Sequence, residues 1–278
     1  GSVMLMDALA RSLNIPTVNI GMKLGLTKVI SVQQAMGWDK VTIPKVPSML
    51  LGSYAISPYD VTKLYQTIAN EGASIPLNTI NSVVDRQGNV VYSREFEPKQ
   101  VVPREAAFQT LFAMQQVVDR GTAHSLQPDY AYLHLAGKTG TTNDARDTWF
   151  VGIDGENVTT IWLGRDDNGE TKLTGASGAL QVYKEYLKRA TTRPLKLHKP
   201  EEIKWVGINA YGGWDCSSAR TIPVWADRNQ SFCQQTEYAP TIPSANAVET
   251  NNAPKQESVW DVLNEGNSAP VEDARPAN

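Results

Sequence analysis

The sequence is poor in the residues that commonly bind metal ions. It has two cysteines and three histidines among 278 residues. Two thiols are too few for a structural zinc site, and the histidines at positions 124, 134 and 198 lie far from them in the sequence. A resident metal ion is therefore not expected.

Long apolar runs and strongly basic segments are also missing. No stretch approaches the roughly 20 apolar residues that a membrane-spanning helix needs. Residues 1–6 have no basic start, Asp7 interrupts the apolar run, and there is no initiator methionine, so we interpret the start as an internal boundary and not as a signal peptide. The formal net charge of −3, without a lysine- and arginine-rich stripe, argues against a nucleic-acid partner.

The composition changes along the chain and predicts three parts. The whole sequence is 41% hydrophobic and 20% charged, as in ordinary globular proteins. After residue 195 the periodicity weakens and tryptophan and turn residues become frequent, and from residue 236 proline, asparagine, alanine and glutamate dominate. We predict a main domain over residues 1–195, a small appendage over 196–235 and a disordered tail over 236–278.

Hydrophobic periodicity predicts a mixed α/β main domain. Apolar residues at helical spacing, with proline, serine, threonine and glycine at the expected ends, favour helices at 3–11, 16–25, 27–37, 59–69, 104–120 and after a capping Ser177. Residues 80–84 and 90–92 form a predicted hairpin. The segments 148–153 and 158–163 are predicted strands, antiparallel because a short connection joins them.

Residues 136–142 form a polar segment whose residue types indicate a candidate ligand-binding site. Its Gly137-Lys138-Thr139 matches the end of a phosphate-binding loop, but the glycine required five residues earlier is replaced by Tyr132. Hydroxyls at Thr139 and Thr141, which share one face of an extended segment, and a cation at Lys138 instead suit a ligand with a terminal carboxylate. The alternative is a polar end of a strand with a solvated lysine.

A second segment, Ser12-Leu13-Asn14, lies in the loop between the first two predicted helices. Taken alone it is more typical of a helix cap than of a catalytic site. Ser12 and Lys138 are 126 residues apart (138 − 12), and the two segments in this order are far more specific together than either alone.

Together these segments resemble the transpeptidase domain of class A, bifunctional penicillin-binding proteins, most closely the type 1b enzymes of Gram-negative bacteria. The resemblance runs from residue 1 to about 235. It includes residues 11–18, 114–118 with Gly121-Thr122, 135–142, 147–150 and 164–166. It implies the penicilloyl-serine transferase or β-lactamase-like fold, an antiparallel sheet flanked by helices. In that fold the Lys138 strand lies at one edge, and two further strands precede residue 1, so the fold is incomplete at its N-terminal side.

The resemblance also assigns roles to individual residues. Ser12 would relay a proton to the leaving amine, and Asn14 would bind the substrate amide. Lys138 would supply positive potential, and Thr139, Gly140 and Thr141 would bind the substrate carboxylate, with the Thr141 N–H completing an oxyanion hole. No metal ion or organic cofactor is implied.

One departure from the family pattern concerns the nucleophile. No Ser-x-x-Lys occurs in these 278 residues. In the family that motif precedes the Ser12 segment, so we expect it, a glycosyltransferase domain and a membrane anchor upstream of residue 1, and we expect the chain alone to be inactive and to fold poorly. A sharp cooperative melt of the isolated chain would contradict the expectation of poor folding.

By resemblance, the intact protein acts at the periplasmic face of the bacterial inner membrane. The implied partners are peptidoglycan stem peptides ending in D-Ala-D-Ala, β-lactam antibiotics, the upstream half of the polypeptide, an outer-membrane lipoprotein activator and cell-division proteins. A D,D-carboxypeptidase, a serine β-lactamase and a non-catalytic sensor module that binds penicillin or peptidoglycan are the alternatives.

The expected location bears on the two cysteines. A Cys216–Cys233 disulfide would close a loop of 17 residues (233 − 216), which stabilises a fold by on the order of 3 kcal/mol. Such a bridge needs an oxidising compartment, and otherwise the pair is two reduced thiols. The extracytoplasmic location favours the disulfide.

Overall fold

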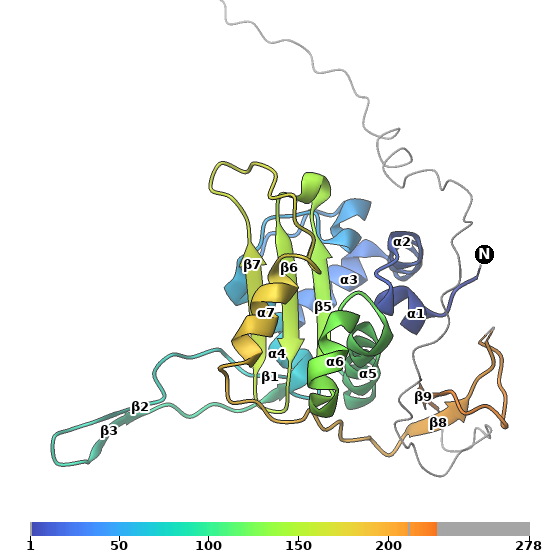
Figure 1. Cartoon of the computed structure of the whole chain (residues 1–278). Helices are drawn as coiled ribbons and strands as arrows, with labels where there is room; N and C mark the ends of the chain where they lie inside the picture. The colour runs from blue at the N-terminus through green and yellow to red at the C-terminus, as the bar shows by residue number, and fades with distance from the viewer. Residues whose placement is uncertain (1, 211, 227–278) are drawn as a thin grey trace, which may run out of the picture. The chain divides into compact units, whose positions relative to one another are not determined.

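A three-stranded antiparallel sheet forms the centre of the protein, as a computed structural model shows for residues 2–210 and 212–226 (Figure 1). The strands are β5 (Ala136–Thr141), β6 (Thr148–Ile153) and β7 (Val158–Leu163), in that order across the sheet. In the register, Lys138 lies opposite Val151, which lies opposite Thr160. Because side chains alternate along a strand, these three residues share one face of the sheet, and Phe150 belongs to the other.

Seven helices and three small two-stranded sheets surround the central sheet in the described part of the chain. The helices are α1 (Leu5–Ala10), α2 (Asn14–Leu24), α3 (Leu26–Gln33), α4 (Pro58–Ala69), α5 (Arg104–Arg120), α6 (Gln127–Tyr130) and α7 (Ala179–Leu187). The small sheets pair β1 (Ala73–Ser74) with β4 (Lys99–Gln100), β2 (Ser82–Val84) with β3 (Val90–Ser93), and β8 (Ile203–Gly207) with β9 (Thr221–Trp225). Short helical turns occupy Gln34–Trp38, Pro47–Leu51, His124–Leu126, Ala131–Leu133 and Asn143–Ala145.

Helices cover both faces of the sheet, with α7 in front and α4 behind in Figure 1. On the α7 side Phe150 and Tyr183 are fully buried, and their ring centroids lie 4.9 Å apart. Gly152 is required beneath this contact, because a Cβ there would lie 2.2 Å from the Tyr183 ring. On the α4 side the Thr62 hydroxyl donates to that of Thr160 at 2.8 Å.

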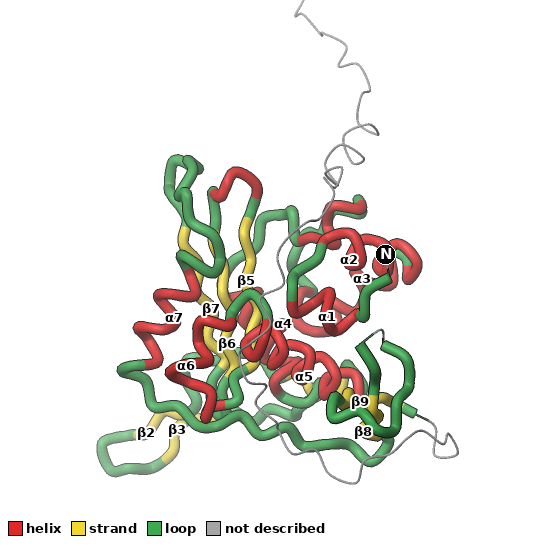
Figure 2. Tube along the Cα trace, turned by 45° about the vertical axis from the view of Figure 1, so that its right-hand side comes forward, coloured by secondary structure: helices red, strands yellow, loops and turns green. Residues whose placement is uncertain are grey.

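Helix α5 lies between α1 and the β8–β9 hairpin (Figure 2). Its C-terminal end is tied to α1, since Arg120 Nη2 donates to Asp7 Oδ1 at 2.6 Å. Toward its N-terminal end, Phe108 and Phe112 make edge-on contacts with Trp205 of β8, at centroid distances of 6.1 and 5.2 Å. Helix α5 and the ion pair of Arg220 with Asp7, at 2.7 Å, therefore both connect this part of the chain to its start.

The structure confirms most of the predicted elements. The strands 148–153 and 158–163 and the helix 104–120 have the predicted bounds, and the Ser57 hydroxyl caps α4 by accepting from the Asp60 N–H. The second helix was predicted too late, because Asn14 and Ile15 already belong to it ahead of the proline. The prediction that Ser177 caps α7 is wrong, since its hydroxyl bonds Thr174 and α7 begins after Gly178.

Some predictions concern residues beyond those described. The disulfide between Cys216 and Cys233 stays a prediction, because Cys233 lies outside the described residues, and the tail 236–278 lies outside them as well. A search of the helices in the described ranges found none both long and apolar enough to cross a membrane. Within the same ranges β7 pairs with β6 alone, in line with the open strand edge of the implied fold.

Replacing Phe150 by alanine tests the packing between the sheet and α7. We expect a loss of about 3–5 kcal/mol in the free energy of unfolding, because the fully buried ring would leave a cavity. Urea denaturation of the polypeptide containing this chain measures the loss. Tyr132→Ala is the control, since its side chain is 64% exposed and its removal should cost less than about 0.5 kcal/mol. Equal effects of the two substitutions would contradict the assigned core.

Candidate active site

Ser12 lies at the junction between α1 and α2, in an unusual backbone conformation. Its φ of 56° is in the left-handed region, which costs a non-glycine residue roughly 1 kcal/mol. Its N–H donates to Leu9 O at 3.1 Å and the next N–H, that of Leu13, donates to Ala8 O at 2.9 Å, which ends α1. The turn leaves the Ser12 side chain exposed, next to the central sheet.

Lys138 of β5 reaches this serine across 126 positions of sequence. Its Nζ donates to Ser12 Oγ at 2.7 Å and to the carbonyl oxygen of Thr139 at 2.8 Å. Burial lowers the pKa of the lysine from 10.5 to about 8, because desolvation disfavours the charged form. The group is still mostly an ammonium ion at neutral pH, so it acts as a donor toward the serine.

Lys138 and Ser12 together have hydrogen-bond donors left over for a ligand. An ammonium group has three N–H donors, and the two bonds to Ser12 and Thr139 use two of them. Ser12 accepts from the lysine through its oxygen, so its own hydroxyl hydrogen can be donated elsewhere. The pair can therefore present a positive charge and a hydroxyl donor to one bound molecule.

The two threonines that follow Lys138 on β5 are each held by a second residue. Thr139 Oγ1 lies 2.6 Å from Thr122 Oγ1, and Thr141 Oγ1 accepts from the Gly175 N–H at 2.9 Å. Between them, Gly140 packs so closely that a Cβ would lie 3.1 Å from Trp149 Cβ. The 164–178 connection thus folds against the end of β5 and fixes the Thr141 hydroxyl.

Asn14, the third residue of the Ser12 segment, lies at the start of α2 and is exposed. Among the hydrogen bonds given for the described residues, none joins its side chain to Ser12 or Lys138. The structure therefore brings Ser12 to Lys138, next to Thr139, Gly140 and Thr141 on β5.

A cleft of about 200 Å³ lies beside Lys138. One wall is β5 from residue 138 to 142, and the other walls are mainly apolar and aromatic, with Trp38, Tyr54, Tyr65 and Trp149 among them. Burial raises the pKa of Tyr54 and of Tyr65 to about 12, so both hydroxyls are neutral at physiological pH. Lys138, on the face of the sheet that lines the cleft, therefore places a positive charge beside a mainly apolar cleft.

Comparison with known families identifies the family of this chain. The family model described as "Penicillin binding protein transpeptidase domain" matches residues 1–179. The chain belongs to this transpeptidase family. A second model, "Penicillin-binding protein 1B, C-terminal domain", matches residues 202–237. The resemblance inferred from the sequence motifs is confirmed.

The most similar relatives are larger proteins. The chain is 68% identical to penicillin-binding protein 1B of Haemophilus influenzae over 266 residues, covering 96% of this chain and 34% of that protein. It is 47% identical to penicillin-binding protein 1B of Escherichia coli over 257 residues, covering 92% of this chain and 30% of that protein. The transpeptidase segment thus spans about a third of the length of these relatives.

Solved structures confirm the fold. The crystal structure of penicillin-binding protein 1A from Haemophilus influenzae matches with a TM-score of 0.70 at 20% identity, over 81% of this chain and 40% of that one. The PonA1 protein of Mycobacterium tuberculosis in complex with penicillin V matches with a TM-score of 0.58 at 23% identity, over 73% and 60% of the two chains. The predicted mixed α/β fold of the penicillin-binding transpeptidases is therefore correct.

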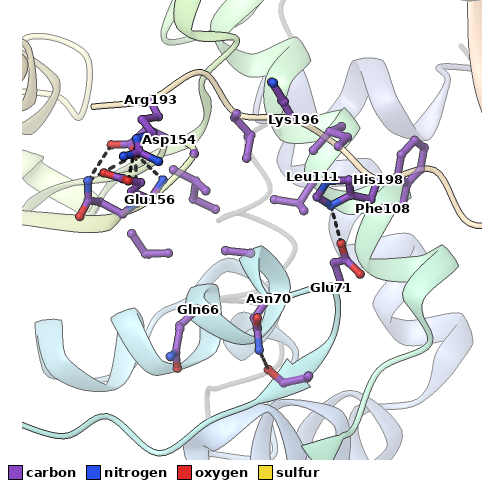
Figure 3. A pocket seen from close by; sticks show the side chains of 18 of the residues that line it. Gln66, Asn70, Glu71, Phe108, Leu111, Asp154, Glu156, Arg193, Lys196 and His198 are labelled. Atoms are coloured by element: carbon purple, nitrogen blue, oxygen red, sulfur yellow. Dashed lines mark hydrogen bonds and ion pairs between the residues drawn. The ribbon is translucent and has the colours of Figure 1, made fainter. Parts of the chain in front are cut away.

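A larger cavity, of about 920 Å³, lies elsewhere in the transpeptidase segment (Figure 3). It is bounded by the end of α4, the start of α5, the β6–β7 turn and residues 193–198, and a 2.8 Å contact between His198 Nδ1 and Glu71 Oε1 lies at its rim. It contains none of the predicted site residues. The described residues also hold no cluster of three or more potential metal ligands. The larger cavity and the predicted site are therefore different places in the segment.

Three further residues, not among the predicted site residues, contact the candidate site. Thr122 and Gly175 hold the two threonine hydroxyls, and Asp147 accepts from the Thr142 hydroxyl at 3.1 Å and from Trp162 Nε1 at 3.0 Å. Gly121-Thr122 belongs to the residues that carry the family resemblance, but no local pattern indicates that its hydroxyl reaches β5. These contacts depend on the folded chain, and their signal in the sequence is weak.

The lowered pKa of Lys138 can be measured directly. In a transpeptidase polypeptide with ¹³C-methylated lysines, we expect the Lys138 resonance to titrate near pH 8, well below exposed lysines near 10.5. Lys138→Arg identifies the resonance by removing it. Titration together with the exposed lysines would contradict the burial of this ammonium group.

The lowered pKa of Lys138 also determines whether its contribution to stability rises or falls with pH. Between about pH 8 and 10.5 the unfolded chain binds the Lys138 proton and the folded chain does not. The contribution of Lys138 to the free energy of unfolding therefore rises with pH in this window. A decline of activity in that window would then reflect loss of the charge and not unfolding caused by this residue.

Proposed function

We propose that this chain supplies the substrate-binding part of a D,D-transpeptidase site that cross-links peptidoglycan stem peptides through an acyl-enzyme, and that β-lactams bind at the same place. The observation that carries the proposal is the 2.7 Å contact between Lys138 Nζ and Ser12 Oγ at the border of the cleft. The family membership of residues 1–179 supports it.

In this proposal the terminal D-Ala carboxylate is bound by β5. The hydroxyls of Thr139 and Thr141 donate to its oxygens, and the Lys138 ammonium supplies the compensating charge. Gly140 lets the substrate backbone come close, and β5 lies at an edge of the sheet among the described strands, so an extended peptide can align with it. Asn14, two residues after Ser12, binds the substrate amide in this proposal.

The acyl-transfer step needs a nucleophile that this sequence does not contain. A serine oxygen attacks the carbonyl carbon of the penultimate D-Ala, the C–N bond breaks, and the terminal D-Ala leaves with a proton. Ser12 delivers that proton to the leaving nitrogen, and the Thr141 N–H stabilises the oxyanion. No Ser-x-x-Lys occurs in the 278 residues, so we propose that another part of the polypeptide provides the serine and that the chain alone is inactive.

The proposal extends to the whole protein. We propose a bifunctional cell-wall synthase, with a glycosyltransferase domain and an anchor outside this chain, at the periplasmic face of the inner membrane. The 34% and 30% shares of the two penicillin-binding proteins 1B that the chain matches are compatible with further domains. The outer-membrane lipoprotein activator and the cell-division partners belong to this wider proposal.

Labelling with a fluorescent penicillin tests the function. We expect the full-length polypeptide to form a stable covalent adduct, and the rate of labelling to fall by about 100-fold or more in Lys138→Ala, because a positioned charge in a partly buried site is lost. Ser12→Ala should also slow labelling, since the lysine loses its partner and the leaving group its proton source.

Lys28→Ala is the matched control, because Lys28 is an exposed lysine in the same chain. It should be labelled at the rate of the unmodified protein. If the intact polypeptide is not labelled at all, or if Lys138→Ala is labelled as fast as the control, the proposed function is wrong.

A further inference from the structure

The turn after α5, Gly121-Thr122, contacts both parts of the proposed site. The Thr122 N–H donates to Ala10 O at 3.2 Å, and Ala10 precedes Ser12 by two residues. The Thr122 side chain lies on the other side, with its Oγ1 2.6 Å from Thr139 Oγ1. One residue therefore links the helix that leads to Ser12 with the strand that carries Lys138.

The position of this turn is fixed by close packing. A Cβ on Gly121 would lie 2.2 Å from Ala10 O and 2.8 Å from the Cα of Val117, so only glycine permits this approach of α5 to α1. The ion pair of Arg120 with Asp7, at 2.6 Å, holds the same two helices one residue earlier. The backbone of Thr122 thus has little freedom to move relative to Ser12.

Only one direction of the hydrogen bond between Thr122 and Thr139 suits a bound anion. Each hydroxyl has one hydrogen, so only one of the two can donate across the 2.6 Å contact. When Thr139 donates to a carboxylate, its hydrogen is used, and Thr122 must be the donor to Thr139. A donated hydrogen bond also polarises the Thr139 hydroxyl and strengthens its own donation.

The neighbouring threonine shows the same arrangement with a fixed direction. Thr141 Oγ1 accepts from the Gly175 N–H, a group that can only donate, so the Thr141 hydrogen is left for another acceptor. Both hydroxyls then receive a hydrogen bond from the protein and can direct their own hydrogens to one ligand.

We propose that Thr122 is a positioning residue of the transpeptidase site, which directs the Thr139 hydroxyl toward the ligand carboxylate without touching the ligand. The inference rests on the proposed function, because it needs a carboxylate at Thr139. Its effect should be confined to ligands that carry this charge.

Acylation of the full-length polypeptide by two ligands tests the proposal. The ligands are benzylpenicillin and its methyl ester, in which the carboxylate is neutral. Thr122→Val should lower the second-order rate constant with benzylpenicillin by about tenfold, equivalent to weakening one hydrogen bond to a charged group, and leave the rate with the ester within about twofold. Thr122→Ser should restore the rate with benzylpenicillin, because it restores the hydroxyl.

Thr110→Val is the matched control. Thr110 is a partly buried threonine of α5 whose hydroxyl donates to Ala106 O at 2.7 Å, far along the helix from the site. It should leave both rate constants unchanged. Thr122→Val should add nothing in a Thr139→Val background, since it acts through that hydroxyl. If the valine variant does not fold, Thr122→Ala replaces it.

The results distinguish a failure of the positioning role from a failure of the proposed function. Equal loss with the acid and the ester, failure of Thr122→Ser to restore the rate, or additive effects of the Thr122 and Thr139 substitutions would each overturn the positioning role while leaving the proposed function intact. If the unmodified polypeptide is acylated by neither ligand, the proposed function itself fails, and this inference fails with it.

Discussion

The hydrogen bond between Lys138 and Ser12 is the contact on which the rest of the site depends. It joins residues 126 positions apart at a distance of 2.7 Å, so the first helices and the central sheet must be placed accurately relative to each other. An ammonium group that loses water must regain partners, and here it has the serine oxygen and the Thr139 carbonyl oxygen. The lowered pKa of about 8 shows that these two partners do not fully compensate for the lost water.

The fold meets this requirement by fixing each side separately. On the sheet side, β5 is paired along its length with β6, and Phe150 and Tyr183 hold the sheet to α7. On the helix side, the end of α1 is held against α5 by the ion pair of Asp7 and by the absence of a side chain at Gly121. The two sides meet at the serine turn and at the Thr122–Thr139 hydroxyl pair.

How well the sequence predicts a feature depends on how far apart along the chain the interacting residues lie. Local signals were enough for the β6–β7 pair and for α5, where alternation or helical spacing is strong and the ends are marked by turn residues. The approach of Ser12 to Lys138 was expected from the family resemblance, because no local pattern encodes a contact across 126 positions.

Other features had no usable signal in the sequence. The Thr122 and Gly175 contacts depend on where distant loops pack. The start of α7 was predicted wrongly for a related reason, since the Ser177 hydroxyl bonds Thr174 and does not cap the helix.

The position of α5 has a mechanical consequence. With 17 residues it is a rod about 25 Å long, which has Trp205 of the β8–β9 hairpin near one end and the Gly121 turn at the other. A tilt of only a few degrees about one end displaces the opposite end by about 1 Å, the scale on which catalytic alignment is lost. A displacement of the hairpin that tilts α5 would therefore move the Gly121 turn, which contacts both Ala10 and, through Thr122, Thr139.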